Sequence, residues 1–181
     1  MRKIIAVLLA ALMVFALVAC GKEDTTPVTS DSQPATVGTT LSADFMEKIT
    51  ANPEMTAQEM ADALLTNPII QFAGASMPVE QGLLMGFDET EIKGFKEGVM
   101  FAPMIGAIPF VGYIFVLEDG TDVAAFEETL KTSANPRWNI CTEAEETIVT
   151  SSGNTVFFVM CPMSFEEEAP AEDMTDEIIA E

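Results

Sequence analysis

The chain has 181 residues, contains no histidine, and carries 29 acidic against 8 basic side chains, for a net charge of −21 at pH 7. The missing histidine removes the commonest general base and the commonest zinc ligand, which excludes serine-histidine and cysteine-histidine hydrolases. A charge this negative repels phosphate backbones, so we expect no nucleic-acid partner.

The first residues have the features of a secretory signal. A positively charged start precedes the apolar stretch 4–18, which is too short to span a bilayer comfortably, and Ala19 is the small residue before a cleavage site. The run Leu-Val-Ala-Cys-Gly at 17–21 resembles the lipobox of bacterial lipoproteins, whose cysteine receives a diacylglyceryl group. The resemblance implies a signal peptide over residues 1–19 and a lipid on Cys20 that holds the mature protein at the extracytoplasmic face of the cell membrane. The alternative is an uncleaved N-terminal anchor helix.

The regions on either side of the predicted domain are polar. Residues 20–40 are rich in Thr, Ser, Pro and Asp, with almost no large apolar side chain, which predicts a disordered tether. Residues 166–181 carry eight acidic and no basic side chains, which predicts a mobile acidic tail. Residues 41–165 remain as a single folded domain.

Two short helices are predicted at the start of this domain. The first begins at Ser42 as its N-cap and ends at Asn52-Pro53. The second begins with the capping box of residues 56–59 and ends at Asn67-Pro68. Their inward faces carry apolar side chains at helical spacing, namely Phe45, Met46 and Ile49 in the first helix and Met60, Ala63 and Leu64 in the second.

The middle of the chain is harder to assign. Residues 81–87 could form a short strand, and Asp88 is a candidate N-cap for a helix that continues through Phe95. Residues 98–117 contain no charged side chain, so a membrane span is one alternative. Prolines and glycines interrupt this stretch, and we instead expect a loop at 103–107 followed by a strand from Ile108 to Leu117 in the middle of a sheet, covered on both faces.

The last part of the domain has clearer patterns. A turn at Glu118-Asp119-Gly120 leads to a helix capped by Thr121 or Asp122, with Val123, Phe126 and Leu130 on its inward stripe. Asn135-Pro136 ends this helix, and strands at 146–150 and 155–161 follow, joined by a turn at 151–154. The strand-helix-strand-strand order predicts an α+β domain, with a small antiparallel sheet packed against N-terminal and central helices.

Three of these segments together resemble a known family. They are Pro109 to Val116, the Asp-Gly turn with its helix, and Pro136 to Cys141 with the closing hairpin. The combination is similar to small lipoproteins of anaerobic Gram-positive, Clostridia-like bacteria that carry a domain of unknown function. The resemblance covers about residues 41–162. It implies an α+β fold and a cell-envelope setting, and it brings no catalytic residue.

Catalytic and metal-binding patterns are weak in this sequence. Nearly all carboxylates fall in predicted turns, helix starts or the tail, and Glu80 and Glu97 are the least surface-like candidates for an acid/base pair. The turn at 119–122 lacks the alternating oxygen ligands of a calcium loop. We therefore assign no catalytic residue, metal ligand or cofactor, and we expect that the protein is not an enzyme.

Two pairs of residues remain as candidates with alternatives. Cys141 and Cys161 could form a disulfide, which an extracytoplasmic location permits, or they could be buried thiols. Arg137 and Trp138, if exposed, would make a binding patch, because these residue types dominate binding hot spots. In the alternative interpretation, Trp138 fills the core after the helix and Arg137 meets a nearby carboxylate.

These observations favour a lipid-anchored, non-enzymatic module that binds a peptide, a protein or a small ligand. The alternative is an accessory or scaffold subunit of a membrane-associated envelope complex, which would dock through an exposed apolar patch in the Phe101 to Ile108 loop. An enzyme would require a deep pocket with buried carboxylates.

Overall fold

The computed structural model describes residues 35–165. The predicted signal peptide, Cys20, the first part of the predicted tether and the acidic tail lie outside these residues. The elements in chain order are α2 (Val37–Ala51), α3 (Ala57–Leu65), β1 (Gly74–Pro78), β2 (Gly82–Leu83), β3 (Glu91–Ile92), β4 (Phe95–Pro103), β5 (Val111–Leu117), α4 (Val123–Ser133), β6 (Glu146–Ser152) and β7 (Thr155–Cys161).

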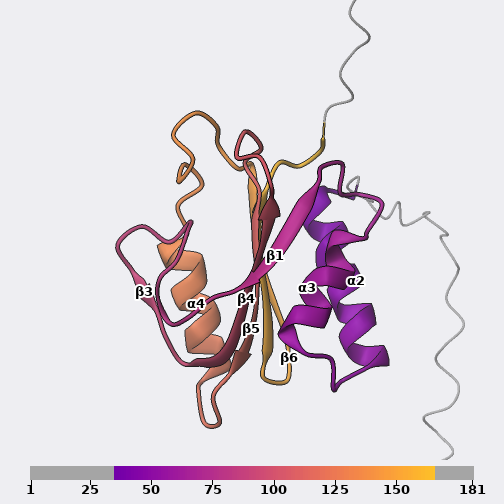
Figure 1. The fold of residues 1–181 in the computed structure, drawn as a ribbon. Helices are drawn as coiled ribbons and strands as arrows, with labels where there is room; N and C mark the ends of the chain where they lie inside the picture. Colours follow the sequence, from indigo (N-terminus) through magenta and orange to yellow (C-terminus); the bar gives the residue numbers. More distant parts are fainter. Residues whose placement is uncertain (1–34, 166–181) are drawn as a thin grey trace, which may run out of the picture. The chain divides into compact units, whose positions relative to one another are not determined.

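An antiparallel sheet organises the domain. Its five strands lie in the order β1-β4-β5-β7-β6, and β2 and β3 form a separate two-stranded sheet. Helices α2 and α3 pack on one face of the larger sheet and α4 packs on the other, so that the sheet lies between two helical layers (Figure 1). The predicted α+β class, with helices packed on an antiparallel sheet, is confirmed.

Alternating side chains of the central strands build two separate cores. In β5, Ile114 faces α2 and α3, whereas Tyr113 and Phe115 face α4. This confirms the prediction that the strand is covered on both faces, which explains its continuous apolar sequence. The first core, under α2 and α3, includes Leu41, Phe45, Met60, Leu64, Phe101, Phe157 and Val159. The second core, under α4 and the segment around β3, includes Phe87, Ile92, Phe95, Phe126, Leu130, Phe158 and Met160.

Helix α2 begins earlier than predicted. Thr36 is its N-cap, and its hydroxyl and that of Thr39 each accept a hydrogen bond from the other's backbone N–H. The N–H of Gly38 donates to the Glu146 carboxylate at 2.6 Å, which fastens the first turn to β6. The first four residues of α2 therefore belong to the folded domain and not to a disordered tether, and Ser42 lies inside the helix instead of capping it.

The predicted second helix is confirmed as α3. The Thr56 hydroxyl accepts from the Glu59 N–H at 3.2 Å, and the Glu59 carboxylate accepts from the Thr56 N–H at 2.9 Å. The Thr56 hydroxyl also donates to the Glu59 carboxylate at 2.9 Å, and the two bonds that this carboxylate accepts from Thr56 hold the pKa of Glu59 below its ordinary value. Two of the predicted inward residues were wrong. On α2, the Met46 side chain is 38 % exposed. On α3, Ala61 is buried, whereas Ala63, which was expected to be buried, is only partly covered.

The predicted helix from Asp88 through Phe95 is absent from the described residues, where β3 and the start of β4 occupy this segment. Asp88 has a φ of 47° and Gly94 a φ of 96°, and both values interrupt a right-handed helix. In β4 the register shifts between Phe95 and Glu97, which hides the alternation of apolar side chains in the sequence.

The uncharged stretch 98–117 forms the rest of β4, a loop and β5. Residues 104–107 of the predicted loop fall in this connection, whereas Pro103 is the last residue of β4, and β5 begins at Val111, three residues later than expected. Across residues 35–165, none of the helices is both long enough and apolar enough to cross a bilayer.

The predicted C-terminal elements are confirmed. Asp122 caps α4 by accepting from the Ala125 N–H at 3.1 Å, and Phe126 and Leu130 are buried. Strands β6 and β7 pair over their full lengths through a tight turn at Gly153, whose φ is 58°.

Candidate functional site

Part of the sheet face that carries α4 is left uncovered by that helix. Within residues 35–165, α4 packs mainly on β6 and β7, and Phe126 reaches Phe115 in β5. The register pairs Met77 of β1 with Met100 of β4, and Met100 with Tyr113 of β5. Because paired residues point to the same face, β1 and β4 extend the floor of the second core as an open apolar surface.

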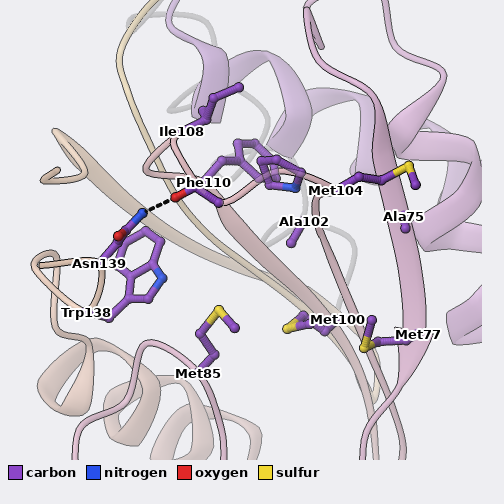
Figure 2. A pocket seen from close by; sticks show the side chains of 12 residues that line it. Ala75, Met77, Met85, Met100, Ala102, Met104, Ile108, Phe110, Trp138 and Asn139 are labelled. Carbon is purple, nitrogen blue, oxygen red and sulfur yellow. Dashed lines mark hydrogen bonds between the residues drawn. The ribbon is translucent and has the colours of Figure 1, made fainter. Parts of the chain in front are cut away.

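Three segments from elsewhere in the chain surround this floor. The β4–β5 loop borders it on one side, while the segment after β2 and the segment after α4 border it on another (Figure 2). The amide of Asn139 donates to the Gly106 carbonyl at 2.6 Å and so joins two of the three segments. They enclose a groove of about 510 Å³, the methionine groove, lined by Ala75, Met77, Met85, Met100, Ala102, Pro103, Met104, Gly106, Ile108, Phe110, Trp138 and Asn139.

The lining of the methionine groove is apolar and deformable. It contains four thioethers and one indole but no charged side chain. Met85 is 52 % exposed, Met104 is 71 % exposed, and the adjacent Ile105 is 78 % exposed. Methionine side chains are flexible and polarisable, and they recur on surfaces that adapt to different apolar partners. The volume lies within the range of about 300–1,000 Å³ typical of ligand sites.

The backbone beneath Met85 is fixed, although its side chain is exposed. The Tyr113 hydroxyl donates to the Met85 carbonyl at 2.9 Å, and the Asn135 N–H donates to the Gly86 carbonyl at 2.8 Å. A tyrosine hydroxyl is already protonated at neutral pH, and burial in the second core raises the pKa of Tyr113 further. The groove therefore combines a hydrogen-bonded backbone with exposed methionine side chains, such as those of Met85 and Met104.

Arg137 and Trp138 have different roles in the structure. The Arg137 guanidinium is exposed and donates to the Glu143 carboxylate at 2.7 Å, which is the predicted contact with a nearby acid. Trp138 is half-buried, packs against the edge of the second core and lines the methionine groove. Of the predicted binding patch, Trp138 belongs to the groove, whereas Arg137 lies outside its lining.

The two cysteines are not joined. Cys141 is exposed in the loop beyond Trp138, whereas Cys161 is buried in the first core. Burial and the nearby Glu146 carboxylate raise the pKa of the Cys161 thiol. Of the two alternatives for these cysteines, the structure does not form the disulfide, because β7 directs Cys161 into the first core while Cys141 is exposed in a loop. The alternative of two buried thiols holds only for Cys161.

The candidate carboxylates do not form a site. Glu80 and Glu97 are both exposed, and Asp122 is engaged as the cap of α4. In the part of the chain that the structure describes, no three His, Cys, Asp or Glu side chains gather as metal ligands would. The groove is thus the feature with the clearest chemical character.

Sequence reasoning missed most of the groove residues. Met77 and Met85 fall in a segment whose elements could not be assigned, and Met100 lies in the strand that was not predicted. Twelve methionines in 181 residues were the available signal, but their spacing in the sequence does not reveal that four of them converge.

No protein-family model, no curated protein and no solved structure matches this chain. The resemblance to small lipoproteins of anaerobic bacteria therefore stays a prediction.

Proposed function

We propose that this chain is a lipid-anchored extracytoplasmic binding module and not an enzyme, and that the methionine groove takes an apolar ligand or the apolar side chains of a peptide. The observation that carries the proposal is the groove itself, in which an uncovered sheet floor and three separate segments enclose an uncharged space. Nothing in its lining could transfer a proton near neutral pH, and every lining side chain except that of Asn139 is apolar.

The energetics favour occupancy of the groove. Exposed apolar area costs about 25 cal/mol per Å² relative to burial. Met77, Met85, Met104 and Ile105 together expose a large apolar area around one opening. A ligand that covers these side chains gains this hydrophobic free energy without having to build the site, because the frame beneath Met85 is already fixed.

The lipid on Cys20 sets where such binding takes place. Without residues 1–19, which include Arg2 and Lys3, the chain has 6 basic and 29 acidic side chains and a net charge of −23, which opposes close contact with anionic headgroups, so the lipid holds the protein at the membrane. Cys20→Ala should move the protein from the membrane fraction to the soluble fraction on cell fractionation. Retention in the membrane fraction would contradict the lipid anchor.

The groove can be tested with a neutral apolar dye, N-phenyl-1-naphthylamine, because Trp138 is the only tryptophan and lies in the groove. The protein used is residues 21–181, which retain every described element of both cores. Dye binding should quench Trp138 by energy transfer and should saturate. Met85→Gln should weaken dye affinity about tenfold, because the dye would bury an amide without a partner.

Met46→Gln is the matched control, since Met46 is also exposed but lies on α2 under the other face of the sheet. We expect this variant to bind the dye as the parent protein does. Equal weakening by both substitutions, or a dye signal that never saturates, would contradict a specific site in the groove.

One observation favours docking to an envelope complex as a second candidate function. Met104 and Ile105 are exposed at the tip of the β4–β5 loop, while Phe101 is buried in the first core. The predicted apolar patch is therefore smaller than the Phe101 to Ile108 segment. If the protein is an accessory subunit, Ile105→Asp should abolish co-purification of a stoichiometric membrane partner while dye binding in the groove persists.

A further inference from the structure

Strand β1 lies at the edge of the sheet, beside α3 (Figure 1), and has β4 as its one neighbouring strand in the described sheet. The Ala73 carbonyl accepts from the Met104 N–H at 2.9 Å, and the Val79 N–H donates to the Gly98 carbonyl at 2.8 Å. Because alternate residues of an antiparallel strand bond to the same neighbour, the odd-numbered residues of β1 bond to β4. The N–H and C=O of Ser76 therefore point away from the sheet, and residues 35–165 provide no partner for them.

The two faces of β1 differ in chemistry. Ala75 and Met77 point into the methionine groove. On the opposite face, the Ser76 hydroxyl accepts from the Gln58 amide at 2.5 Å and donates to the Asp62 carboxylate, both on α3. A strand added beside β1 would therefore meet an apolar groove on one face and an exposed carboxylate on the other.

The sequence of β1 does little to prevent such pairing. Exposed edge strands are usually protected by charged side chains, proline or short length. The five residues of β1 include no charged side chain, and Pro78 protects only its last position. The other edge strand, β6, packs between α2 and α4, and neither of its faces opens onto the groove.

We propose that the partner is an extended peptide segment that adds antiparallel to β1, placing apolar side chains in the methionine groove and basic side chains beside Asp62. This inference rests on the proposed function of the groove. A basic segment fits the charge of the protein, which is −21 overall. A second copy of the chain would carry the same negative charge, so self-pairing through β1 is opposed by repulsion.

The register of an added antiparallel strand follows from β1. The partner residue opposite Ser76 exchanges both backbone bonds with it, and its side chain lies on the α3 face near Asp62. The residues before and after it point toward Ala75 and Met77. Main-chain bonds then supply affinity, and the alternation of basic and apolar side chains supplies specificity.

The test uses a capped peptide of alternating valine and lysine, titrated into residues 21–181 at about 0.15 M ionic strength while Trp138 fluorescence is recorded. Two further peptides are N-methylated at every lysine or at every valine. Lysine methylation removes the N–H groups that face β1, so binding should weaken at least about tenfold. Valine methylation removes only N–H groups that point away from β1, on the outer edge of the added strand, and should leave the affinity of the peptide unchanged. Equal affinities of the two methylated peptides, or weaker binding of the valine-methylated peptide, would overturn the proposal.

Charge recognition is tested with Asp62→Asn against Glu47→Gln, which changes an exposed carboxylate on α2, a helix that packs on β6 and β7. Both variants lose one negative charge, but only Asp62→Asn should weaken the unmethylated peptide, by about threefold. Equal effects would show that the peptide responds to overall charge, which would also overturn the proposal. Thermal unfolding of both variants verifies that each is folded.

The outcomes separate this inference from the proposed function. Dye binding in the groove without peptide binding would overturn strand addition and leave the groove as a small-ligand site. Failure of both would overturn both. A doubled mass in light scattering of the peptide-free protein would assign the edge to a second copy instead, if the doubled mass is lost when Ser76→Pro removes the outward N–H at position 76 in a folded variant.

Discussion

Gly112 in the central strand β5 gives a sharp test of the first core, through the substitution Gly112→Ala. A Cβ at this position would lie 2.2 to 2.6 Å from three ring atoms of Phe101, whereas apolar carbons in contact normally stay about 3.5–4.0 Å apart. Phe101 has no exposed surface, and its ring lies within 5.8 Å of Phe110 and 6.4 Å of Phe157 between ring centres. The ring therefore cannot move aside without displacing other aromatic side chains.

Overpacking of this kind costs about 1–3 kcal/mol, and the closeness of the contact favours the upper half of that range. Urea denaturation, followed by circular dichroism and by Trp138 fluorescence, measures the free energy of unfolding. Gly106→Ala is the matched control, because a Cβ at Gly106 would meet no atom within 4 Å. We expect this control to change stability by less than about 0.5 kcal/mol.

A double-mutant cycle identifies the cause of the destabilisation. Phe101→Leu removes the ring atoms that the new methyl group would meet, so Gly112→Ala should cost less in the Phe101→Leu background than in the parent protein. A near-neutral effect of Gly112→Ala alone, or strict additivity in the cycle, would refute the packing described between β4 and β5.

Three further predictions concern the second core and the titrating groups. Phe126→Ala should destabilise the domain by about 3–5 kcal/mol in urea denaturation, since this ring is 5 % exposed and packs edge-on against Phe115; a neutral result would show that α4 does not cover the core. In native residues 21–181, a thiol reagent should label Cys141 and spare Cys161 until the protein unfolds, and protection of both thiols would indicate a disulfide. Cys161 and Tyr113 have pKa values raised above their ordinary 9.0 and 10.0, so the folded state keeps protons that the unfolded chain loses. These two groups should therefore leave the free energy of unfolding unchanged between about pH 6 and pH 8.5 and make it fall as pH rises further, and Tyr113→Phe should reduce this fall.

The elements that sequence reasoning placed correctly are those fixed by local interactions. The capping box at Thr56 and Glu59 and the cap at Asp122 depend on side chains within three residues of each other. The closing hairpin depends on a turn at Gly153 between two apolar segments. In each case the physical cause lies within a short window of the chain, so the pattern is visible in one sequence.

The elements that were mispredicted depend on distant contacts. The start of α2 is held by Glu146, more than a hundred residues away, and the identity of β1 depends on pairing with β4. The bulge near Glu97 hides the alternation of β4. The methionine groove joins four segments that are brought together only by the sheet, so its existence follows from tertiary structure and not from any local pattern.

The use of thioethers in place of aliphatic side chains makes the groove sensitive to oxidants. Oxidation of methionine to its sulfoxide turns an apolar, flexible side chain into a polar one, and susceptibility follows exposure. Met104 and Met85 are open to solvent, whereas Met60 and Met160 are sealed in the two cores. An oxidant would therefore change the polarity of the groove while leaving the packing of the domain intact, and a reductase acting on methionine sulfoxide would restore it.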